Sequence, residues 1–305
     1  MKNNKILVAL VILVFMVFAL GSGSSSSESS SSGHSNVSSN TGNDAGSSSS
    51  SSSTKKEIPT IEETVLLDQD GIVVTAKEIV DESVWGQGIK VLIENNSSRD
   101  VTVTATAMAV NGYMLTDFLY EKVTADAKSN AVIHCLNNEL EKAGITNIEE
   151  VAIWFSLVDP ESYMTSYSSD EPAILRTSLY TGAESEAFSD GIEVINQDGI
   201  RVVVKYVDEK SIWGTSVLIY AENNSGRNVG LSADNVSING FMIDGYYYAD
   251  IKSGYKSFDD MTIFSSSLKD NDIEKIDNIK LTFNCYDTDS YSTIFESDYV
   301  TIDVE

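Results

Sequence analysis

The stretch that decides the fold of this protein occurs twice. Residues 94–101 read Glu-Asn-Asn-Ser-Ser-Arg-Asp-Val, and residues 222–229 read Glu-Asn-Asn-Ser-Gly-Arg-Asn-Val. The same offset of 128 positions aligns the chain with itself, without a gap, from residue 68 to residue 165, with about three residues in ten identical. Self-similarity of this length indicates two copies of one structural unit. We therefore predict two modules, at residues 58–177 and 193–305, joined by an acidic linker at 178–192.

Apolar residues alternate with polar ones in both copies, which is the period of a β-strand with one buried face. Ile72, Val74 and Ala76 form one such row and align with apolar residues of the second copy. Many short alternating rows within about 110 residues predict an all-β fold, a β-sandwich of immunoglobulin-like architecture. Further rows lie at Ile89, Val91 and Ile93, at Val101, Val103 and Ala105, and at Val151, Ile153, Phe155 and Leu157.

Two local signals refine the strand pattern. In both copies the row that starts at Val101 (Val229) skips a step before Met108 (Val236), which indicates a β-bulge. Asn-Gly follows at 111–112 and again at 239–240, and this dipeptide favours a two-residue hairpin turn because both residues tolerate a positive φ.

The N-terminus has the pattern of an export signal. Two lysines precede an apolar run from Ile6 to Leu20, which suits a signal peptide over residues 1–21 and is short for a membrane span. Residues 20–23 read Leu-Gly-Ser-Gly, like a lipoprotein processing site with glycine in place of the lipidated cysteine, so a lipid anchor cannot form there. The chain would be released by cleavage or kept as an uncleaved anchor. Residues 22–57 are mostly serine and predict a disordered tether.

The composition excludes several classes of function. A formal charge of −26 argues against nucleic acid and anionic lipid as partners. His134 is the one histidine of the predicted modules, so neither a Ser/His/Asp triad nor a histidine zinc site can be built there. Cys135 and Cys285 replace aliphatic residues of the other copy, which predicts buried thiols rather than a disulfide. We expect no enzyme activity, no cofactor and no metal ion.

The amino-acid sequence of the second copy resembles that of a known group of proteins. The strings Asn-Gln-Asp-Gly-Ile at 196–200, Ile-Trp-Gly at 212–214 and Ser-Ile-Asn-Gly-Phe-Met at 237–242 accompany the stretch at 222–229. Together they are similar to duplicated immunoglobulin-like modules of uncharacterised exported proteins and lipoproteins of clostridial-type Gram-positive bacteria, the DUF4352-like group. The resemblance implies a fold and an exported, secreted or cell-surface location, but no activity and no binding residues.

Aromatic residues are the main candidates for binding. Trp85 and Trp213 are expected in loops, and Tyr163 and Tyr291 near the C-terminal edges of the modules. Tyr247 lies in a run of three tyrosines that cannot all face one core. Such side chains anchor protein interfaces or stack on sugar rings. The alternative is that the tryptophans close the ends of the modules and the tyrosines cover a sheet face.

Acidic loops are weaker candidates. Asp159, Glu161, Asp287 and Asp289 follow the last apolar row of each copy and could offer oxygens to Ca²⁺, but no complete set of ligands follows. A solvated acidic loop is the alternative. Across the base of the turn at 94–99, Glu94 and Arg99 predict an ion pair, with a ligand site as the alternative.

These observations favour a non-enzymatic extracellular or cell-surface interaction protein, engaged in protein binding or envelope assembly. The alternative is a carbohydrate- or peptidoglycan-binding protein that uses exposed aromatic residues. The ligand would be an extracellular protein or a glycan.

Overall fold

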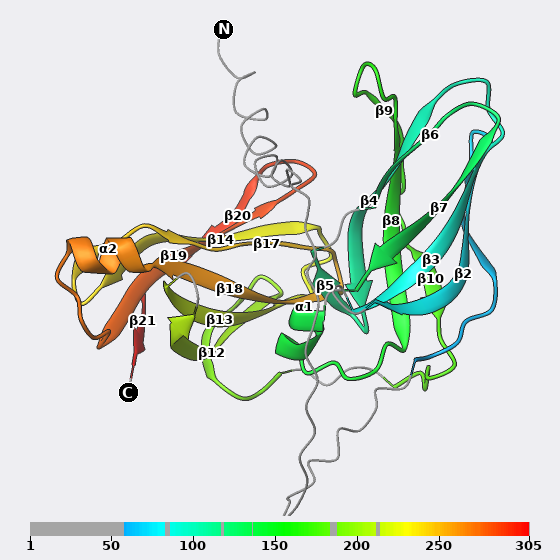
Figure 1. The fold of residues 1–305 in the computed structure, drawn as a ribbon. Helices are drawn as coiled ribbons and strands as arrows, with labels where there is room; N and C mark the ends of the chain where they lie inside the picture. Colours follow the sequence, from blue (N-terminus) through cyan, green and yellow to red (C-terminus); the bar gives the residue numbers. More distant parts are fainter. Residues whose placement is uncertain are drawn as a thin grey trace, which may run out of the picture. The chain divides into compact units, whose positions relative to one another are not determined.

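A computed structural model describes residues 58–82, 86–116, 119–135, 137–183, 188–211 and 214–304 (Figure 1). The predicted signal peptide and tether lie outside these residues. The described part is almost entirely β-structure with two six-residue helices, α1 (Asn137–Lys142) and α2 (Ser265–Asp270), which confirms the all-β prediction. We call residues 58–177 the first repeat and residues 193–305 the second; these bounds, and the immunoglobulin-like class, stay predictions.

The first repeat contributes two antiparallel groups of strands. The first group runs in the order β1 (Thr64–Gln69), β2 (Ile72–Glu82), β3 (Gly86–Asn95) and β7 (Ala127–His134). The second group has β4 (Val101–Val110) at its centre, flanked by β8 (Glu150–Val158) on one side and by β5 (Tyr113–Leu115) and β6 (Tyr120–Val123) on the other. Strand β8 also pairs with β9 (Thr165–Ser168) and β10 (Ala173–Arg176).

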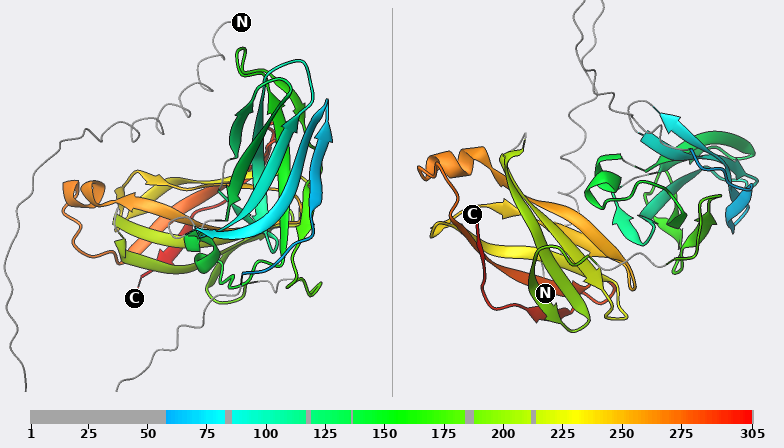
Figure 2. Two further views of the ribbon diagram at one scale, coloured as in Figure 1. Left: turned by 45° about the vertical axis from the view of Figure 1, so that its right-hand side comes forward. Right: turned by 90° about the horizontal axis from the view of Figure 1, so that it is seen from below.

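The second repeat has its strands at the same offset, in two layers (Figure 2). One layer runs in the order β11 (Ile192–Gln197), β12 (Ile200–Ser211), β13 (Gly214–Asn223) and β18 (Lys256–Phe264), with β16 (Gly245–Tyr246) on β18. In the other layer, β14 (Val229–Ile238) pairs with β15 (Phe241–Met242), β17 (Tyr248–Ile251) and β19 (Asn278–Asp287). Strand β19 also pairs with β20 (Thr293–Glu296) and β21 (Val300–Asp303).

The core is built from the alternating residues. Val74, Val91, Val103 and Ile153 are buried together between the strand groups of the first repeat, and the aligned residues of the second repeat fill a core of their own. Because burying an aliphatic side chain of this size contributes about 1.5–3 kcal/mol, the alternating rows fix which face of each strand points inward. Cys135 and Cys285 are buried in these cores as predicted, and burial raises the pKa of the Cys285 thiol to about 11.

The bulge and the hairpin turn are confirmed. The pairing of β4 with β8 shifts register between Ala105 and Ala107, and that of β14 with β19 shifts between Asp234 and Ser237. Asn111 and Gly112 have φ angles of 50° and 84°, as a two-residue turn with mirror-image geometry requires. The Asn111 amide donates to the Asn147 carbonyl oxygen at 2.8 Å and accepts the N–H groups of residues 149 and 150. Asn239 makes the corresponding three contacts.

Candidate functional site

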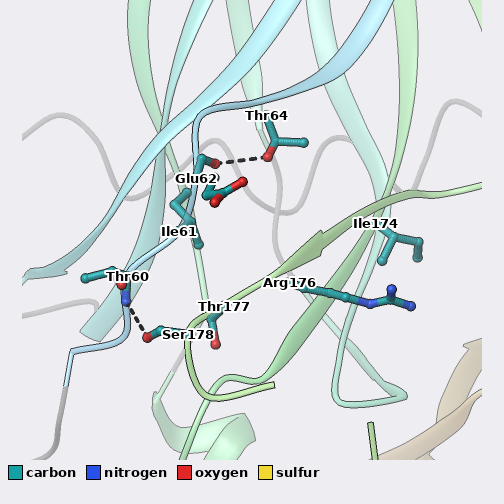
Figure 3. A pocket seen from close by; sticks show the side chains of 8 residues that line it. All are labelled: Thr60, Ile61, Glu62, Thr64, Ile174, Arg176, Thr177 and Ser178. Carbon is teal, nitrogen blue, oxygen red and sulfur yellow. Dashed lines mark hydrogen bonds between the residues drawn. The ribbon is translucent and has the colours of Figure 1, made fainter. Parts of the chain in front are cut away.

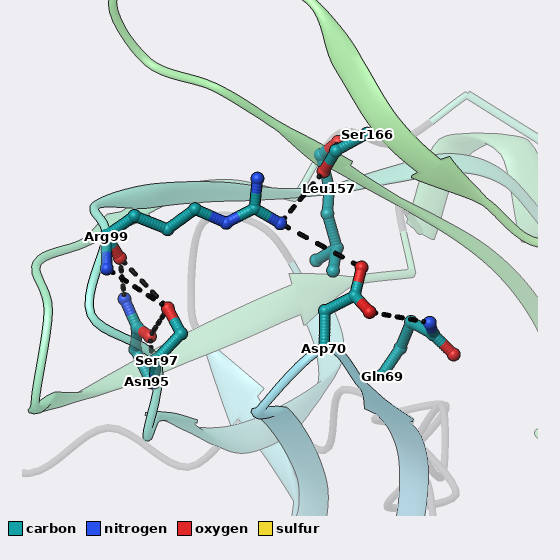
Figure 4. Close-up of polar contacts among 7 residues, drawn as sticks. All are labelled: Gln69, Asp70, Asn95, Ser97, Arg99, Leu157 and Ser166. Carbon is teal, nitrogen blue, oxygen red and sulfur yellow. Dashed lines mark hydrogen bonds and ion pairs between the residues drawn. The ribbon is translucent and has the colours of Figure 1, made fainter.

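The repeated stretch at 94–101 is a structural turn built around a buried amide (Figure 4). Asn95 donates from Nδ2 to the carbonyl oxygens of Arg99 and Val123, at 2.8 and 3.0 Å. Its Oδ1 accepts from the backbone N–H and hydroxyl of Ser97, at 3.0 and 2.7 Å. Asn223 makes the same four hydrogen bonds in the second repeat. Because every hydrogen bond of this buried amide is made within the chain, the Asn95 side chain serves folding and leaves none of its own polar atoms for a ligand.

The ion pair predicted for this turn is wrong. Arg99 lies 3.8 Å from Asp70 and 3.4 Å from the Ser166 hydroxyl (Figure 4). Glu94 instead pairs with Lys128 of the adjacent strand β7. Glu94 and Arg99 are separated because the strand β3 ends at Asn95 and the chain turns away from it. These pairs are largely exposed, so each contributes under about 1 kcal/mol.

A second turn, between β8 and β9, presents an aromatic side chain. We call residues 159–164, with their counterparts 287–292, the tyrosine turns. Asp159 Oδ1 accepts the N–H groups of Glu161 and Ser162 at 3.0 and 2.8 Å and the Ser162 hydroxyl at 2.9 Å. The Tyr163 N–H then donates to the Asp159 carbonyl oxygen at 2.9 Å. The carboxylate thereby fixes the backbone of the turn.

The tyrosine turn of the second repeat is built in the same way. Asp287 Oδ1 accepts the N–H groups of Asp289 and Ser290, both at 2.9 Å, and the Tyr291 N–H donates to the Asp287 carbonyl oxygen at 2.8 Å. These hydrogen bonds, led by the Ser162 and Ser290 backbone N–H groups, hold the pKa values of Asp159 and Asp287 below their usual range. Both carboxylates are therefore ionised at neutral pH.

The two tyrosines stand out into solvent from a strained backbone. Tyr163 and Tyr291 have φ angles of 58° and 56°, a region that bulky residues rarely adopt, at a cost of about 1–3 kcal/mol each. Their side chains are 74% and 81% exposed, and the adjacent Met164 is 70% exposed. Both candidate residues are thus exposed, while their role in binding stays a prediction.

The calcium hypothesis gains no support. Within the part of the chain that the structure describes, no three side chains of the Asp, Glu, His or Cys type converge on one point. Asp159 and Asp287 use one carboxylate oxygen for the turn, Glu161 is exposed, and Asp289 accepts from the Asn228 amide at 3.3 Å. The four carboxylates serve the turns or face solvent.

The prediction that Tyr247 contributes to a binding surface is wrong. Its side chain is buried and lies edge-on to Phe283, with the ring centroids 6.2 Å apart. Strand β16 pairs with β18 in one layer and β17 pairs with β14 in the other, so the chain crosses between layers at Tyr247 and its ring fills the gap. The exposed tyrosines of the run are Tyr246 and Tyr248. Trp85 and Trp213 lie outside the described residues.

The exposed pair Phe241 and Met242 escaped the sequence analysis. Both belong to the short strand β15 after the Asn-Gly turn, and their side chains are 50% and 66% exposed. Their position directly after a hairpin turn gives no signal by itself, because Tyr113 holds the same position in the first repeat and is buried.

A shallow groove of about 630 Å³ runs between the segment before β1 and strand β10 (Figure 3). Arg176 in its wall donates to Glu150 at 2.8 Å, and its guanidinium lies 4.5 Å from the centre of the Tyr180 ring. Glu62 is the one acid among its lining residues, whereas glycoside hydrolysis needs two carboxylates that flank the substrate. The described lining residues are Thr60, Ile61, Glu62, Thr64, Ile174, Arg176, Thr177 and Ser178.

A smaller groove of about 360 Å³ lies in the second repeat, between residues 194–197 and 296–300. Its two acids, Glu296 and Asp298, belong to the same wall, and the facing wall carries none. Neither groove therefore sets two carboxylates on opposite sides of a substrate.

Comparison with known proteins adds little about function. No protein-family model and no curated protein matches the chain. Among solved structures, a protein of unknown function from Porphyromonas gingivalis W83 is 10% identical over 80% of this chain and 96% of its own, with a TM-score of 0.21. The exo-chitosanase CsxA of Amycolatopsis orientalis is 12% identical over 71% of this chain and 25% of its own, with a TM-score of 0.24. Red sea bream transglutaminase is 8% identical over 82% and 32%, with a TM-score of 0.19.

The chain thus spans about a quarter to a third of the two enzymes, and similarities at these TM-scores carry no functional argument. In the described residues, every helix is too short or too polar to cross a membrane.

Proposed function

We propose that the protein is a non-enzymatic binding protein of the cell surface or extracellular space, and that its two tyrosine turns contact a protein partner. The observation that carries the proposal is the recurrence of one strained, aspartate-fixed turn that exposes a tyrosine in both repeats. A conformation that costs free energy is kept where the side chain it presents is used. The proposed location rests on the signal-peptide pattern of residues 1–21.

Tyrosine suits this task for physical reasons. Its ring gives a large contact area with few rotatable bonds, and its hydroxyl can hydrogen-bond at the rim of an interface, so tyrosines are enriched at binding hot spots. Met164 next to Tyr163 adds a flexible apolar contact that adapts to the partner surface. The net charge of −26 favours a partner with a basic surface and an association rate that falls with added salt.

Two further observations favour binding over catalysis. Both grooves lack facing carboxylates, and the predicted modules contain a single histidine. A carbohydrate ligand is the second candidate, because exposed Tyr163 and Tyr291 could stack on sugar rings.

The test is a binding assay of the purified full chain on isolated Gram-positive cell envelopes. We expect the double variant Tyr163→Ser/Tyr291→Ser to bind at least tenfold more weakly, which corresponds to about 1.4 kcal/mol. The matched control is Tyr120→Ser, which removes a tyrosine that is 63% exposed on strand β6. Circular dichroism checks that all variants fold.

Protease treatment of the envelopes separates the two candidates. Loss of binding after protease supports a protein partner. Binding that survives protease and is competed by soluble peptidoglycan fragments supports the carbohydrate alternative. Equal binding of the double variant and the unmodified chain would show that the tyrosine turns are not the contact.

A further inference from the structure

The outer face of the layer formed by β12, β13 and β18 carries an apolar patch between charged residues. Alternation places Ile219 and Ala221 of β13 inside the core of the second repeat, so Leu218 and Tyr220 between them point outward. Phe258 pairs directly with Tyr220 and shares its face. Yet Leu218, Tyr220 and Phe258 are all buried. We call Val203, Leu218, Tyr220 and Phe258 the socket; all four pack with the core residues of the first repeat.

The hairpin of the first repeat covers the socket. The Tyr113 ring lies 6.3 Å from the Tyr220 ring and 6.4 Å from the Phe258 ring, measured between centroids. The Lys256 N–H of β18 donates to the Gly112 carbonyl oxygen at 2.9 Å, and Lys256 pairs with Tyr113 in parallel. We call residues 112–114 the knob. Its contact combines ring packing with a backbone hydrogen bond, as interior packing does.

Two contacts flank the knob. Trp154 of β8 points away from the core of the first repeat and is buried, with its ring 5.2 Å from that of Tyr255. On the other side, Lys142 of α1 forms an ion pair with Asp260 of β18. Phe188, from the segment between the repeats, closes the socket with its ring 5.2 Å from Phe258 and 5.5 Å from Tyr220.

The aligned positions of the first repeat act as an internal control. The residues 128 positions before the socket are Thr75, Lys90, Leu92 and Asn130, none of which is buried. The buried aromatic pair of the second repeat therefore has no counterpart at the aligned positions of the first. An aromatic pair at outward positions needs a partner surface to exclude water, and the knob provides it.

From these contacts we propose that the knob and the socket are a built interface, which holds the first repeat on the second as one fixed unit. The occupant of the aromatic face is the β4–β5 hairpin of the same chain. This inference is independent of the proposed function, because it concerns residues that the tyrosine turns do not contact.

Thiol cross-linking in the full chain tests the proposal. Lys142→Cys/Asp260→Cys places thiols at an ion pair of the interface, and Tyr113→Cys/Lys256→Cys places them on paired residues. The native Cys135 and Cys285 are buried and do not compete. With a short bismaleimide we expect both pairs to cross-link within one chain in most molecules, identified by the mass of the joined peptides. The first pair leaves the knob intact, so its result does not depend on the loss of Tyr113.

The matched control is Tyr113→Cys/Lys128→Cys. Lys128 aligns with Lys256 but lies on strand β7 of the first repeat, beside Glu94 at the turn end of the sheet. We expect at least a tenfold lower yield from the control. Equal and low yields from all three pairs would overturn the proposal, since the repeats would then move independently. Cross-linked dimers in place of monomers would also overturn it, because the knob would then occupy the socket of a second copy.

Discussion

The β4–β5 hairpin of the first repeat and the β14–β15 hairpin of the second have similar turn sequences but different surroundings. Both place an aromatic residue and a methionine directly after an Asn-Gly turn, Tyr113 with Met114 in one and Phe241 with Met242 in the other. Tyr113 is 7% exposed, whereas Phe241 is 50% exposed. Since the local sequence and turn are the same, the difference comes from what each ring contacts: Tyr113 packs on the aromatic socket, whereas Phe241 is half exposed to solvent. A duplicated chain thus carries its own control for every long-range contact.

The largest effect should come from removing the two aromatic residues in turn. Tyr113→Ser leaves a hole against Tyr220 and Phe258, and loss of a buried aromatic side chain costs about 3–5 kcal/mol. Phe241→Ser removes a half-exposed ring, and we expect about 1 kcal/mol or less. Chemical denaturation of the full chain measures both. Equal losses for the two variants would contradict the asymmetry between the hairpins.

A smaller effect should distinguish Asp259 from its counterpart Ala131. Burial, then the nearby carboxylate of Glu139, raises the pKa of Asp259 to about 6 against the opposing influence of Ser257 and Lys142. Because the folded-state pKa lies above the unfolded value, the protonated carboxyl favours folding below about pH 4, and this contribution is lost as the pH rises through about 6.

Denaturation curves between pH 4 and pH 7 test the Asp259 prediction. The shift sets an upper limit of about 3 kcal/mol on the loss, and we expect Asp259→Asn to remove most of it and to be more stable than the unmodified chain at pH 7. The control Asp68→Asn, which removes an exposed carboxylate of β1, should not reproduce the gain in stability at pH 7. Parallel pH profiles of Asp259→Asn and the unmodified chain would show that Asp259 is not the titrating group.

The smallest effect concerns the strained tyrosine turns, where the two repeats should behave alike. Tyr163→Gly and Tyr291→Gly relieve the backbone strain of a positive φ. The gain in stability is offset in part by the greater conformational freedom of glycine in the unfolded chain. We expect each variant to be stabilised by about 0.5–1 kcal/mol while envelope binding falls. Thermal unfolding and the binding assay measure the two quantities on the same samples. A loss of stability in either variant would show that the ring contributes to folding.

Local chemistry made much of the fold predictable. The bulge after Ala105 and the Asn111-Gly112 turn follow from neighbouring residues alone, and two aligned copies let each be checked twice. Tyr163 and Tyr291 were identified for a similar reason, because they follow the last apolar row.

Long-range geometry explains what was missed. Which of three consecutive tyrosines faces inward depends on where the chain crosses between layers, so Tyr247 was misassigned. The socket was not predicted because strand alternation places Tyr220 and Phe258 on the outer face of the sheet. Residues on an outer face are normally in contact with solvent. The pairing of Lys256 with Tyr113, 143 residues away along the chain, makes that face an interior together with Phe188.

The Asn-Gly turns also bear on the chemical ageing of the molecule. Asn-Gly is the dipeptide most prone to deamidation, in which the glycine nitrogen attacks the asparagine side-chain carbonyl carbon and ammonia leaves. Water then opens the resulting cyclic imide to give aspartate or isoaspartate. In the folded chain the side-chain amides of Asn111 and Asn239 are each held by three hydrogen bonds to the backbone, which keeps that carbon from the geometry of attack. Unfolding releases both amides. Isoaspartate at positions 111 and 239 should therefore accumulate in proportion to the time that each repeat spends unfolded. The modified residues remain in the chain after the repeat has refolded.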